Sequence, residues 1–505
     1  MPNGYILAID IGTSACKVVV FDRNGAVVAS ETRAYPVYYP APGYAEQKPE
    51  EWWAAACDAV KSLLSYGPVR PEDIQAVGLD GQSWSCILVD KNGGVLFGNP
   101  IWMDGRAADI CEEIKRSIPE KDIFKVSGNP FEPMYTTPKI LWFRQKYPDV
   151  FKRTYKVLQS NGYFVYKLTG KFSQDSSMGY GLHFFDVRSG QWDADLARAL
   201  DIPLDIMPEI FQPRDIVGFV TGEAAKATGL LAGTPVVAGG LDAACSTFGA
   251  GVAEPGQTQE QGGQAGGMSI CLDKCLTHER LIMGMHVVPG RWLLQGGTVG
   301  GGGALKWLRE TMMPELSFED MSELAAKSPV GSNGVIFLPY MSGERSPIWD
   351  KKAKGVYFGL DYARTRSDII RATMEGVAFA LRHNIETAEE AGAYIDSMNP
   401  VGGCANSPVW MRIKSDVTGK PLNVPGSDNG TPLGAAMLAG IGVGIYGDYR
   451  DAIDSAVRIR ASYEPDMENR DKYARYYAVY RELYDKLKGT MSEISEIIAE
   501  SEIVL

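Results

Sequence analysis

Residues 5–25 read YILAIDIGTSACKVVVFDRNG, and this stretch contains two expected strands joined by a short polar turn. Residues 5–9 and 17–21 are apolar runs rich in β-branched and aromatic side chains, which are typical of strands. Residues 22–25 end in Asn-Gly, the strongest short-range signal for a β-hairpin, so residues 26–29 are expected to form a third strand. We therefore predict that the chain starts as an antiparallel sheet.

Strands, glycine-rich turns and helices alternate along the rest of the chain. Residues 74–79 and 235–238 predict strands, and residues 86–89 predict a strand that runs into a second Asn-Gly turn. A change in composition begins near Gly249, after which glycines cluster. The alternation predicts an α/β protein with two domains, residues 1–248 and 249–505. Helices are expected at residues 49–64, 137–146, 162–168, 194–200, 304–310, 367–391, 430–442 and 471–495. The patterns of 137–146 and 162–168 look amphipathic.

Composition excludes several classes of partner. The 505 residues carry a formal net charge of −12, which argues against nucleic acid or an anionic membrane as partner. We expect a cytoplasmic protein, because we find no targeting segment and no apolar run near the ~20 residues of a spanning helix. The 8 cysteines include no CxxC pair and the 4 histidines no HxxxH pair, so neither disulfides nor a zinc site are expected.

Asp242 follows the apolar run 235–238 across the turn Gly239-Gly240-Leu241. Glycine lacks a Cβ, so the backbone of such a turn can approach a ligand closely. Burying an unpaired carboxylate is unfavourable, so a carboxylate at this position must have a partner or a function. Local sequence by itself favours the plainer interpretation, in which Asp242 caps the following helix.

Residues 10–17 (DIGTSACK) join the first two expected strands. Backbone N–H groups and hydroxyls of a short turn with Gly12, Thr13 and Ser14 can bind phosphate oxygens. Asp10, at the end of a buried strand, could hold Mg²⁺ directly or through water. The alternative is an ordinary turn with a solvated Asp10. The chain has no GxxxxGK[ST] P-loop.

A glycine run at residues 300–303 precedes the helix expected at 304–310. Such a run could aim the N-terminus of the helix at an anion. The alternative is that these glycines allow close packing of the helix on a strand.

Two long motifs indicate a particular family of proteins. Residues 134–143 (MYTTPKILWF) and the pattern spread over residues 355–375 both resemble signatures of the FGGY family of carbohydrate kinases. The segments 10–17, 401–407 and 433–436 and the Asp242 turn match that family in the same order, so the resemblance spans nearly the whole chain. It implies two actin-like (ribonuclease-H-like) domains around a catalytic cleft. It also implies transfer of the γ-phosphoryl group of ATP to a sugar or polyol hydroxyl.

The resemblance implies roles for individual residues. Asp242 matches the catalytic base and Asp10 the Mg²⁺-associated carboxylate. Gly402, Gly403 and Asn406 match the adenine and ribose side of the nucleotide site. The residues we expect to bind ATP are Gly12, Thr13, Ser14, Lys17, Gly263, Gly300, Gly301, Gly402, Gly403 and Asn406.

Among the branches of the family, the chain is most similar to the kinases of D-xylulose. Gln82, Ser83 and Trp84 lie where those kinases have their GQMH segment, and residues 101–106 (IWMDGR) resemble the substrate-side WxDxR. The resemblance therefore implies that these three residues, Trp102, Asp104 and Asp242 contact the sugar. Glycerol is disfavoured, because glycerol kinases carry an Arg-Glu pair where this chain has Ser83-Trp84.

Three departures from the family pattern affect how the chain can bind sugar and phosphate. Trp84 replaces a histidine and Ala243 an asparagine, and both family residues would normally hydrogen-bond sugar hydroxyls; losing one such bond costs about 1 kcal/mol. Trp84 could instead stack on an apolar sugar face or be a core aromatic. Residues 263–265 (GQA) lack the hydroxyls that the family usually places near the phosphates.

The expected function is phosphorylation of D-xylulose to D-xylulose 5-phosphate. Alternatives are a kinase for gluconate, ribulose, erythritol or another polyol, and a non-catalytic sensor of sugar or nucleotide on the same scaffold. An actin- or chaperone-like ATPase is also considered, since fold alone does not decide function. The expected partner is a small-molecule sugar or polyol, and a homodimer is left open.

Overall fold

The computed structural model describes residues 4–502 and contains a first sheet of seven strands. Its main order is β13 (Ile216–Phe219), β14 (Pro235–Val237), β5 (Ile74–Gly81), β1 (Tyr5–Ile11), β2 (Ala15–Phe21) and β3 (Val27–Ala34). The short strand β15 (Gly240–Leu241) also pairs with β5. β1, β2 and β3 are antiparallel, whereas β5 is parallel to both β1 and β14.

The second sheet repeats this arrangement. Its order is β18 (Ile282–Met285), β19 (Trp292–Thr298), β17 (Gly266–Leu272), β16 (Gln257–Gly262), β22 (Ser397–Val401), β23 (Leu422–Pro425) and β24 (Ile459–Tyr463). β16, β17 and β19 are antiparallel, and β22 is parallel to β16 and β23. Both sheets therefore share the strand order 3-2-1-4-5, which confirms the expected pair of actin-like domains.

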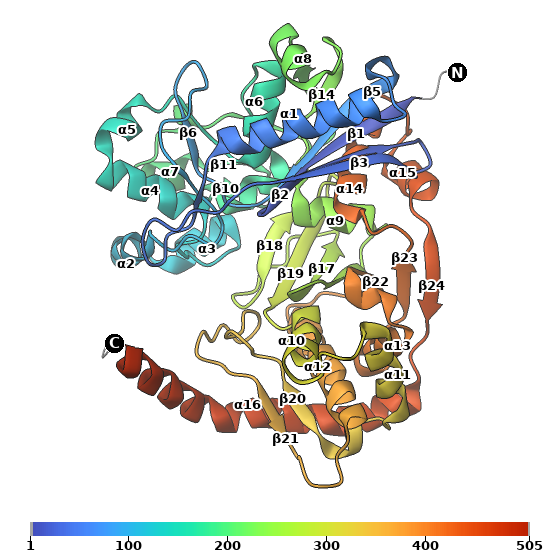
Figure 1. Ribbon diagram of the computed structural model, residues 1–505. Coiled ribbons are helices and arrows are strands. Elements are labelled where there is room, and N and C mark those ends of the chain that lie inside the picture. Colours follow the sequence, from blue (N-terminus) through green and yellow to red (C-terminus); the bar gives the residue numbers. More distant parts are fainter. Residues whose placement is uncertain (1–3, 503–505) are drawn as a thin grey trace.

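Two helices lie between the sheets (Figure 1). They are α9 (Asp242–Gly249) and α14 (Gly430–Gly442), and their apolar core includes Ile6 of the first sheet and Leu293 of the second. Here Gly434 matters, because a Cβ on it would lie 2.0 Å from the Cys245 carbonyl oxygen. α14 comes from the second half of the chain, so residues 430–442 return to the first sheet; α15 (Tyr449–Ala456) follows it there.

The opposite face of the first sheet is covered by α1 (Pro49–Tyr66), α6 (Ser160–Thr169) and α8 (Gly222–Thr228). A side lobe with its own apolar core extends from this domain, on the left of Figure 1. Its helices are α2 (Ala108–Ser117), α3 (Glu120–Ser127), α4 (Thr136–Lys146), α5 (Pro148–Arg153) and α7 (Ala194–Ala199). Its short strands are β4 (Glu46–Gln47), β6 (Ile87–Val89), β7 (Asn99–Pro100), β8 (Lys156–Leu158), β9 (Ser173–Asp175), β10 (Phe185–Asp186), β11 (Gln191–Trp192) and β12 (Glu209–Phe211).

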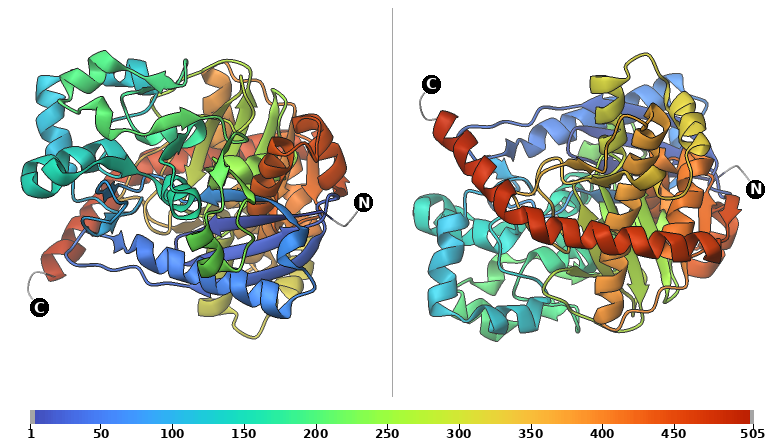
Figure 2. Two further views of the ribbon diagram at one scale, coloured as in Figure 1. Left: turned by 90° about the horizontal axis from the view of Figure 1, so that it is seen from above. Right: turned by 90° about the horizontal axis from the view of Figure 1, so that it is seen from below.

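The outer layer of the second domain is helical. It consists of α10 (Gly302–Met312), α11 (Phe318–Lys327), α12 (Arg366–Glu390) and α13 (Pro408–Thr418), with the β20 (Ile336–Leu338) and β21 (Val356–Phe358) ribbon. The last helix, α16 (Met467–Glu502), runs across the underside of the molecule, as the right-hand view of Figure 2 shows. Its Tyr480 hydroxyl is 2.8 Å from that of Tyr340, which ties α16 to this layer.

Most expected elements form, with small shifts of their ends. The amphipathic interpretation of residues 137–146 and 162–168 is wrong, because eight consecutive residues of α4 (136–143) are buried and most of α6 is too. The second Asn-Gly turn makes no hairpin ladder: β6 pairs with β8, and only the isolated bridge Val89–Val95 closes the turn. Local sequence could not reveal that α4 packs in the core of the side lobe or that α6 packs against the first sheet.

We predict that Gly434→Ala lowers the thermal-melting midpoint, because the added methyl group would force α14 away from α9. Overpacking of this kind costs about 1–3 kcal/mol or more. The matched control is Gly222→Ala, at the first position of α8, where a Cβ would meet nothing within 4 Å. Equal melting midpoints for the two variants would contradict the close-packing argument.

Candidate active site

Three carboxylates lie at one edge of the first sheet, each where a strand ends. Asp10 of β1 is in register with Asp80 of β5, and Asp80 is in register with Gly240 of β15. Asp242 follows β15 directly as the first residue of α9. The turn before it requires glycine, because Gly239 has φ +78° and its Cβ would lie 2.3 Å from the Leu79 carbonyl oxygen.

Asp242 is not a helix cap. The N-cap residue of α9 is Leu241, and Asp242 Oδ1 accepts a hydrogen bond from the adjacent Ala243 N–H at 2.6 Å. Burial raises the pKa of Asp242 to about 7; the Ala243 N–H opposes this rise and the charge of Asp10 adds to it. The local interpretation as a cap is therefore wrong, and Oδ2 is the oxygen left to receive a proton.

Burial also raises the pKa of Asp10, although its contact with Asp80 and the positive charge of Lys17 oppose the rise. Lys17 is in register with Asp10 on β2, and its Nζ donates to Asn429 Oδ1 at the start of α14. Asp80 was not singled out from the sequence. It is fully buried, and its pKa is raised well above the ordinary range by burial and by the charge of Asp10.

The turn after β1 connects the phosphate-binding candidates with the sugar-binding candidates. Gly12 N–H donates to the Ala15 carbonyl at 3.1 Å, which closes the turn, and Ser14 is exposed. The Thr13 hydroxyl accepts from Trp102 Nε1 at 2.9 Å and reaches Gln82 Oε1 at 3.5 Å. A shift of Trp102 or Gln82 would therefore change the position of the Thr13 side chain.

Trp84 is mostly buried rather than open to a ligand. It is 8% exposed and has φ +59°, a left-handed conformation that is rare for a bulky residue. Its ring lies 4.2 Å from that of Tyr135 and 5.7 Å from that of Tyr180. The structure thus places two tyrosines beside Trp84, whose ring packs against them and is largely covered.

Tyr180 links this aromatic group to the carboxylates. Burial raises the pKa of its hydroxyl, hydrogen bonding with the Ser83 side chain lowers it, and the charge of Asp242 raises it further. Ser83 is half-buried, so its hydroxyl can face both Tyr180 and a ligand. No sequence pattern pointed to Tyr180, because it lies about 60 residues before Asp242 in a segment without a motif.

Asp104 is occupied by the protein itself. Both of its oxygens accept from Arg106, at 2.8 Å each, and Oδ2 also accepts from the Ala45 N–H at 2.6 Å. Arg106 is also paired with Glu46 at 2.7 Å. This arrangement corrects the expectation of a direct sugar ligand: Asp104 is buried and holds Arg106, which makes it a positioning residue.

Lys139 connects the two segments that are expected to contact the sugar, residues 82–84 and 101–106. Its Nζ donates to the carbonyls of Trp84 at 2.8 Å and of Ile101 at 2.7 Å, and burial lowers its pKa to about 7. Lys139 lies in the first signature (residues 134–143), so the sequence could have indicated that it belongs to the site. The sequence could not have indicated which two carbonyls accept its hydrogen bonds.

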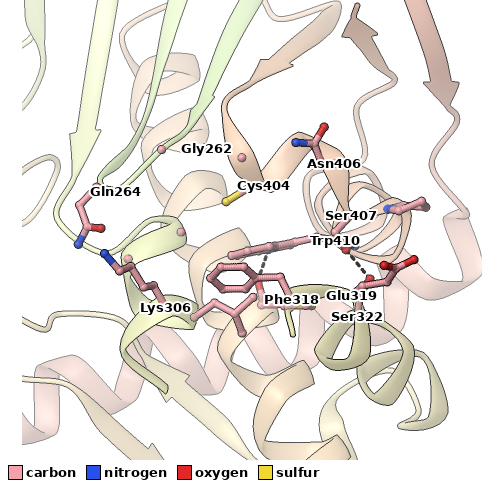
Figure 3. Close-up of a pocket in the computed structure, with 17 residues that line it drawn as sticks. Gly262, Gln264, Lys306, Phe318, Glu319, Ser322, Cys404, Asn406, Ser407 and Trp410 are labelled. Atoms are coloured by element: carbon pink, nitrogen blue, oxygen red, sulfur yellow. Dashed lines mark hydrogen bonds between the residues drawn. The ribbon is translucent and has the colours of Figure 1, made fainter. Parts of the chain in front are cut away.

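A pocket of about 740 Å³ lies in the second domain (Figure 3). Of the predicted ATP-binding residues, Gly263, Gly403 and Asn406 line it, whereas Gly300, Gly301 and Gly402 do not. The lining that the sequence did not indicate includes Gln264, Lys306, Phe318, Cys404 and Trp410. In Figure 3, Gln264 and Lys306 point toward one another at one end of the pocket.

The glycine run before α10 serves packing. A Cβ on Gly300 would lie 2.2 Å from the Pro339 carbonyl oxygen, and one on Gly301 would lie 2.3 Å from the Ala265 carbonyl carbon. Gly302 N–H donates to the Gly263 carbonyl at 2.7 Å and Gly303 N–H to that of Gln264 at 3.0 Å. Of the two interpretations of this glycine run, the contacts therefore favour close packing, because the β16–β17 hairpin already accepts the first N–H groups of α10.

Within residues 4–502, no helix is long and apolar enough to cross a membrane, and no three histidine, cysteine or acidic side chains gather as a metal cluster. Two domains of the same strand order, with carboxylates on one and a pocket of about 740 Å³ on the other, place the protein in the actin-like fold class.

Comparisons with known proteins assign the family. Residues 5–249 match the N-terminal and residues 278–443 the C-terminal domain of the FGGY family of carbohydrate kinases. Xylulose kinase of Escherichia coli (strain K12) is 31% identical over 489 residues, which cover 96% of this chain and 100% of that protein. Gluconokinase of Bacillus subtilis (strain 168) is 26% identical over 506 residues, covering 98% of each.

Solved structures agree with this assignment. The crystal structure of xylulose kinase from Rhodospirillum rubrum matches with a TM-score of 0.89 and 30% identity, covering 97% of this chain and 100% of that one. Gluconate kinase from Lactobacillus acidophilus matches with a TM-score of 0.90 and 25% identity at the same coverage. The chain belongs to the FGGY family, and it is a carbohydrate kinase.

We predict that Lys139→Met lowers kcat/KM for the sugar about 10- to 100-fold, because two buried carbonyls lose their donor at about 1–3 kcal/mol each. The Kd for nucleotide should stay unchanged. The matched control is Lys156→Met, which removes a lysine that also donates to two carbonyls, those of Asp205 and Met207, in the side lobe. A similar loss of kcat/KM in both variants would show a general effect on folding instead.

Proposed function

We propose that this carbohydrate kinase transfers the γ-phosphoryl group of ATP to D-xylulose, giving D-xylulose 5-phosphate, with Asp242 as general base. The observation that carries the proposal is the placement of Asp242: a carboxylate with one free oxygen, at a strand end, with a pKa raised to about 7. A base works best when its pKa is near the working pH. The names of the 31%- and 30%-identical relatives support D-xylulose as the first acceptor to test.

In the proposed reaction, Asp242 Oδ2 takes the proton of the acceptor hydroxyl while that oxygen bonds to the γ-phosphorus. The bond between the γ-phosphorus and the bridging oxygen breaks, and ADP leaves. Phosphoryl transfer depends mainly on positioning and on charge stabilisation, so a correctly placed base and phosphate donors suffice. Ala243 N–H contributes by holding Asp242 in one orientation through Oδ1.

The nucleotide would bind between the two domains. Its adenosine fits the pocket of the second domain, where Phe318 and Trp410 offer apolar surface and Asn406 a polar edge. Its phosphates would then reach Gly12, Thr13, Ser14 and Lys17 of the first. Because residues 263–265 supply no hydroxyl, Gln264 and Lys306 are the polar side chains that this end of the pocket offers instead.

The site fits Mg²⁺, because two carboxyl groups, those of Asp10 and Asp80, face each other at the sheet edge without a basic partner for Asp80. When bound, Mg²⁺ neutralises phosphate charge as it develops. Asp10 is the half-buried member of the pair and is the residue that would meet it first.

A second acceptor class, a sugar acid or another polyol, is favoured by two features. Trp84 packs beside Tyr135 and Tyr180, and Ala243 offers no side-chain hydrogen bond, so neither position supplies the side chain that the xylulose kinase pattern implies for a sugar hydroxyl. The similarity to gluconokinase and to gluconate kinase points in the same direction.

A panel of pentuloses, hexuloses, aldonates and polyols with MgATP tests the acceptor, using a coupled assay for ADP. We expect the highest kcat/KM for D-xylulose. A higher value for gluconate would select the second acceptor class. Absence of turnover on every member would contradict the proposed function.

We predict that kcat/KM rises with pH through about 7, because Asp242 must be ionised to accept a proton. Asp10, Asp80, Tyr180 and Cys245 face this group, and cation binding at the carboxylates would move the midpoint lower. Asp242→Asn should reduce kcat by about 10²–10⁴-fold and flatten the acid limb. The Kd for nucleotide serves as the control; unchanged kcat in this variant would rule out Asp242 as the base.

A further inference from the structure

Asp80 is a buried carboxyl group that takes no part in the proposed proton transfer. It is 0% exposed, and apart from the neighbouring Asp10 carboxyl group, no N–H or O–H donor among the described residues reaches its oxygens. In-register residues of neighbouring strands point to the same face of a sheet, so Asp80 and Asp10 stand side by side. Leaving a buried carboxyl group without donors is costly, so its position needs a physical reason.

No positive charge among residues 4–502 acts on Asp80. The charges that act on it are those of Asp10 and Asp242, and Cys245 packs nearby. Lys17 lies beyond Asp10, one strand further away, and its ammonium group is bonded to Asn429. Two carboxyl groups in this position are stabilised either by a shared proton or by a cation between them.

We propose that Asp80 and Asp10 together form the carboxylate half of a divalent-cation site that binds its ion before the nucleotide arrives. The inference rests on the proposed function, and it goes beyond it by making Asp80 a direct ligand and by placing cation binding before nucleotide binding. Mg²⁺ takes one or two carboxylates and completes six-fold coordination with water and phosphate oxygens. Because no third acidic, histidine or cysteine ligand joins a cluster among residues 4–502, the other positions stay open for water and phosphates.

The test titrates the nucleotide-free protein with Mn²⁺, followed by electron paramagnetic resonance of the free ion. We expect one tight site per chain, at least 10-fold weaker binding in Asp80→Asn, and a similar loss in Asp10→Asn. Asparagine is chosen because it keeps the size of Asp80 and a donor toward Asp10, so a role limited to sharing a proton would leave the affinity unchanged.

Asp416→Asn is the matched control. Asp416 is also buried, at 8% exposure, but it lies in α13 of the other domain and accepts from Asp466 N–H at 2.9 Å and Asn469 Nδ2 at 3.0 Å. Its removal should leave Mn²⁺ affinity at the wild-type value. A loss as large as that of Asp80→Asn would show that the effect is not local.

Thermal melting provides a second readout that does not depend on turnover. A cation that binds only the folded state raises the melting midpoint. We expect Mg²⁺ to raise it for the wild type and for Asp416→Asn but not for Asp80→Asn, whose midpoint without cation should be equal or higher.

Two results would overturn the inference: no stoichiometric Mn²⁺ site in the nucleotide-free wild type, or wild-type affinity in Asp80→Asn. Both are measured without acceptor or ATP, so they are independent of the proposed reaction. If no sugar is phosphorylated but the Mn²⁺ site is present and needs Asp80, the proposed function fails and this inference holds.

Discussion

The close packing of α14 on α9 and on β5 is the contact on which the rest of the structure depends. A Cβ on Gly249 would lie 1.9 Å from the Gly430 carbonyl oxygen, and one on Gly78 would lie 2.2 Å from that of Ala435. Only residues without a side chain allow the three backbones to approach this far. Because α9 begins at Asp242, the same contact decides where the proposed base lies relative to the sheet edge.

The unfavourable free energy of the site comes mainly from its carboxylates. Asp10, Asp80 and Asp242 end neighbouring strands, and burial raises the pKa of each. Such an arrangement is unfavourable in an empty protein, since like charges and desolvation oppose ionisation together. It becomes favourable when a cation, phosphates and a hydroxyl proton are brought to it, which is the situation in phosphoryl transfer.

Sequence reasoning singled out the residues whose proposed role depends on local chemistry. Asp10 and Asp242 were within reach because each ends an apolar strand beside a glycine turn. Asp104 was misjudged, because its acceptors are filled by Arg106 and by a backbone N–H 59 residues away. The role of the glycine run before α10 stayed open for a similar reason: the carbonyl groups that accept its N–H groups come from a distant hairpin.

The sequence by itself determined the α/β class, the family, and the strand and turn that carry Asp10 and Asp242. These features depend on residue type and spacing. Only the tertiary structure decided that Asp80 faces Asp10, that Trp84 is held between two tyrosines, and that Lys139 supports both sugar-side segments. The physical reason is that strand register and the burial of polar groups are set by contacts between segments far apart in the chain. No local pattern records them.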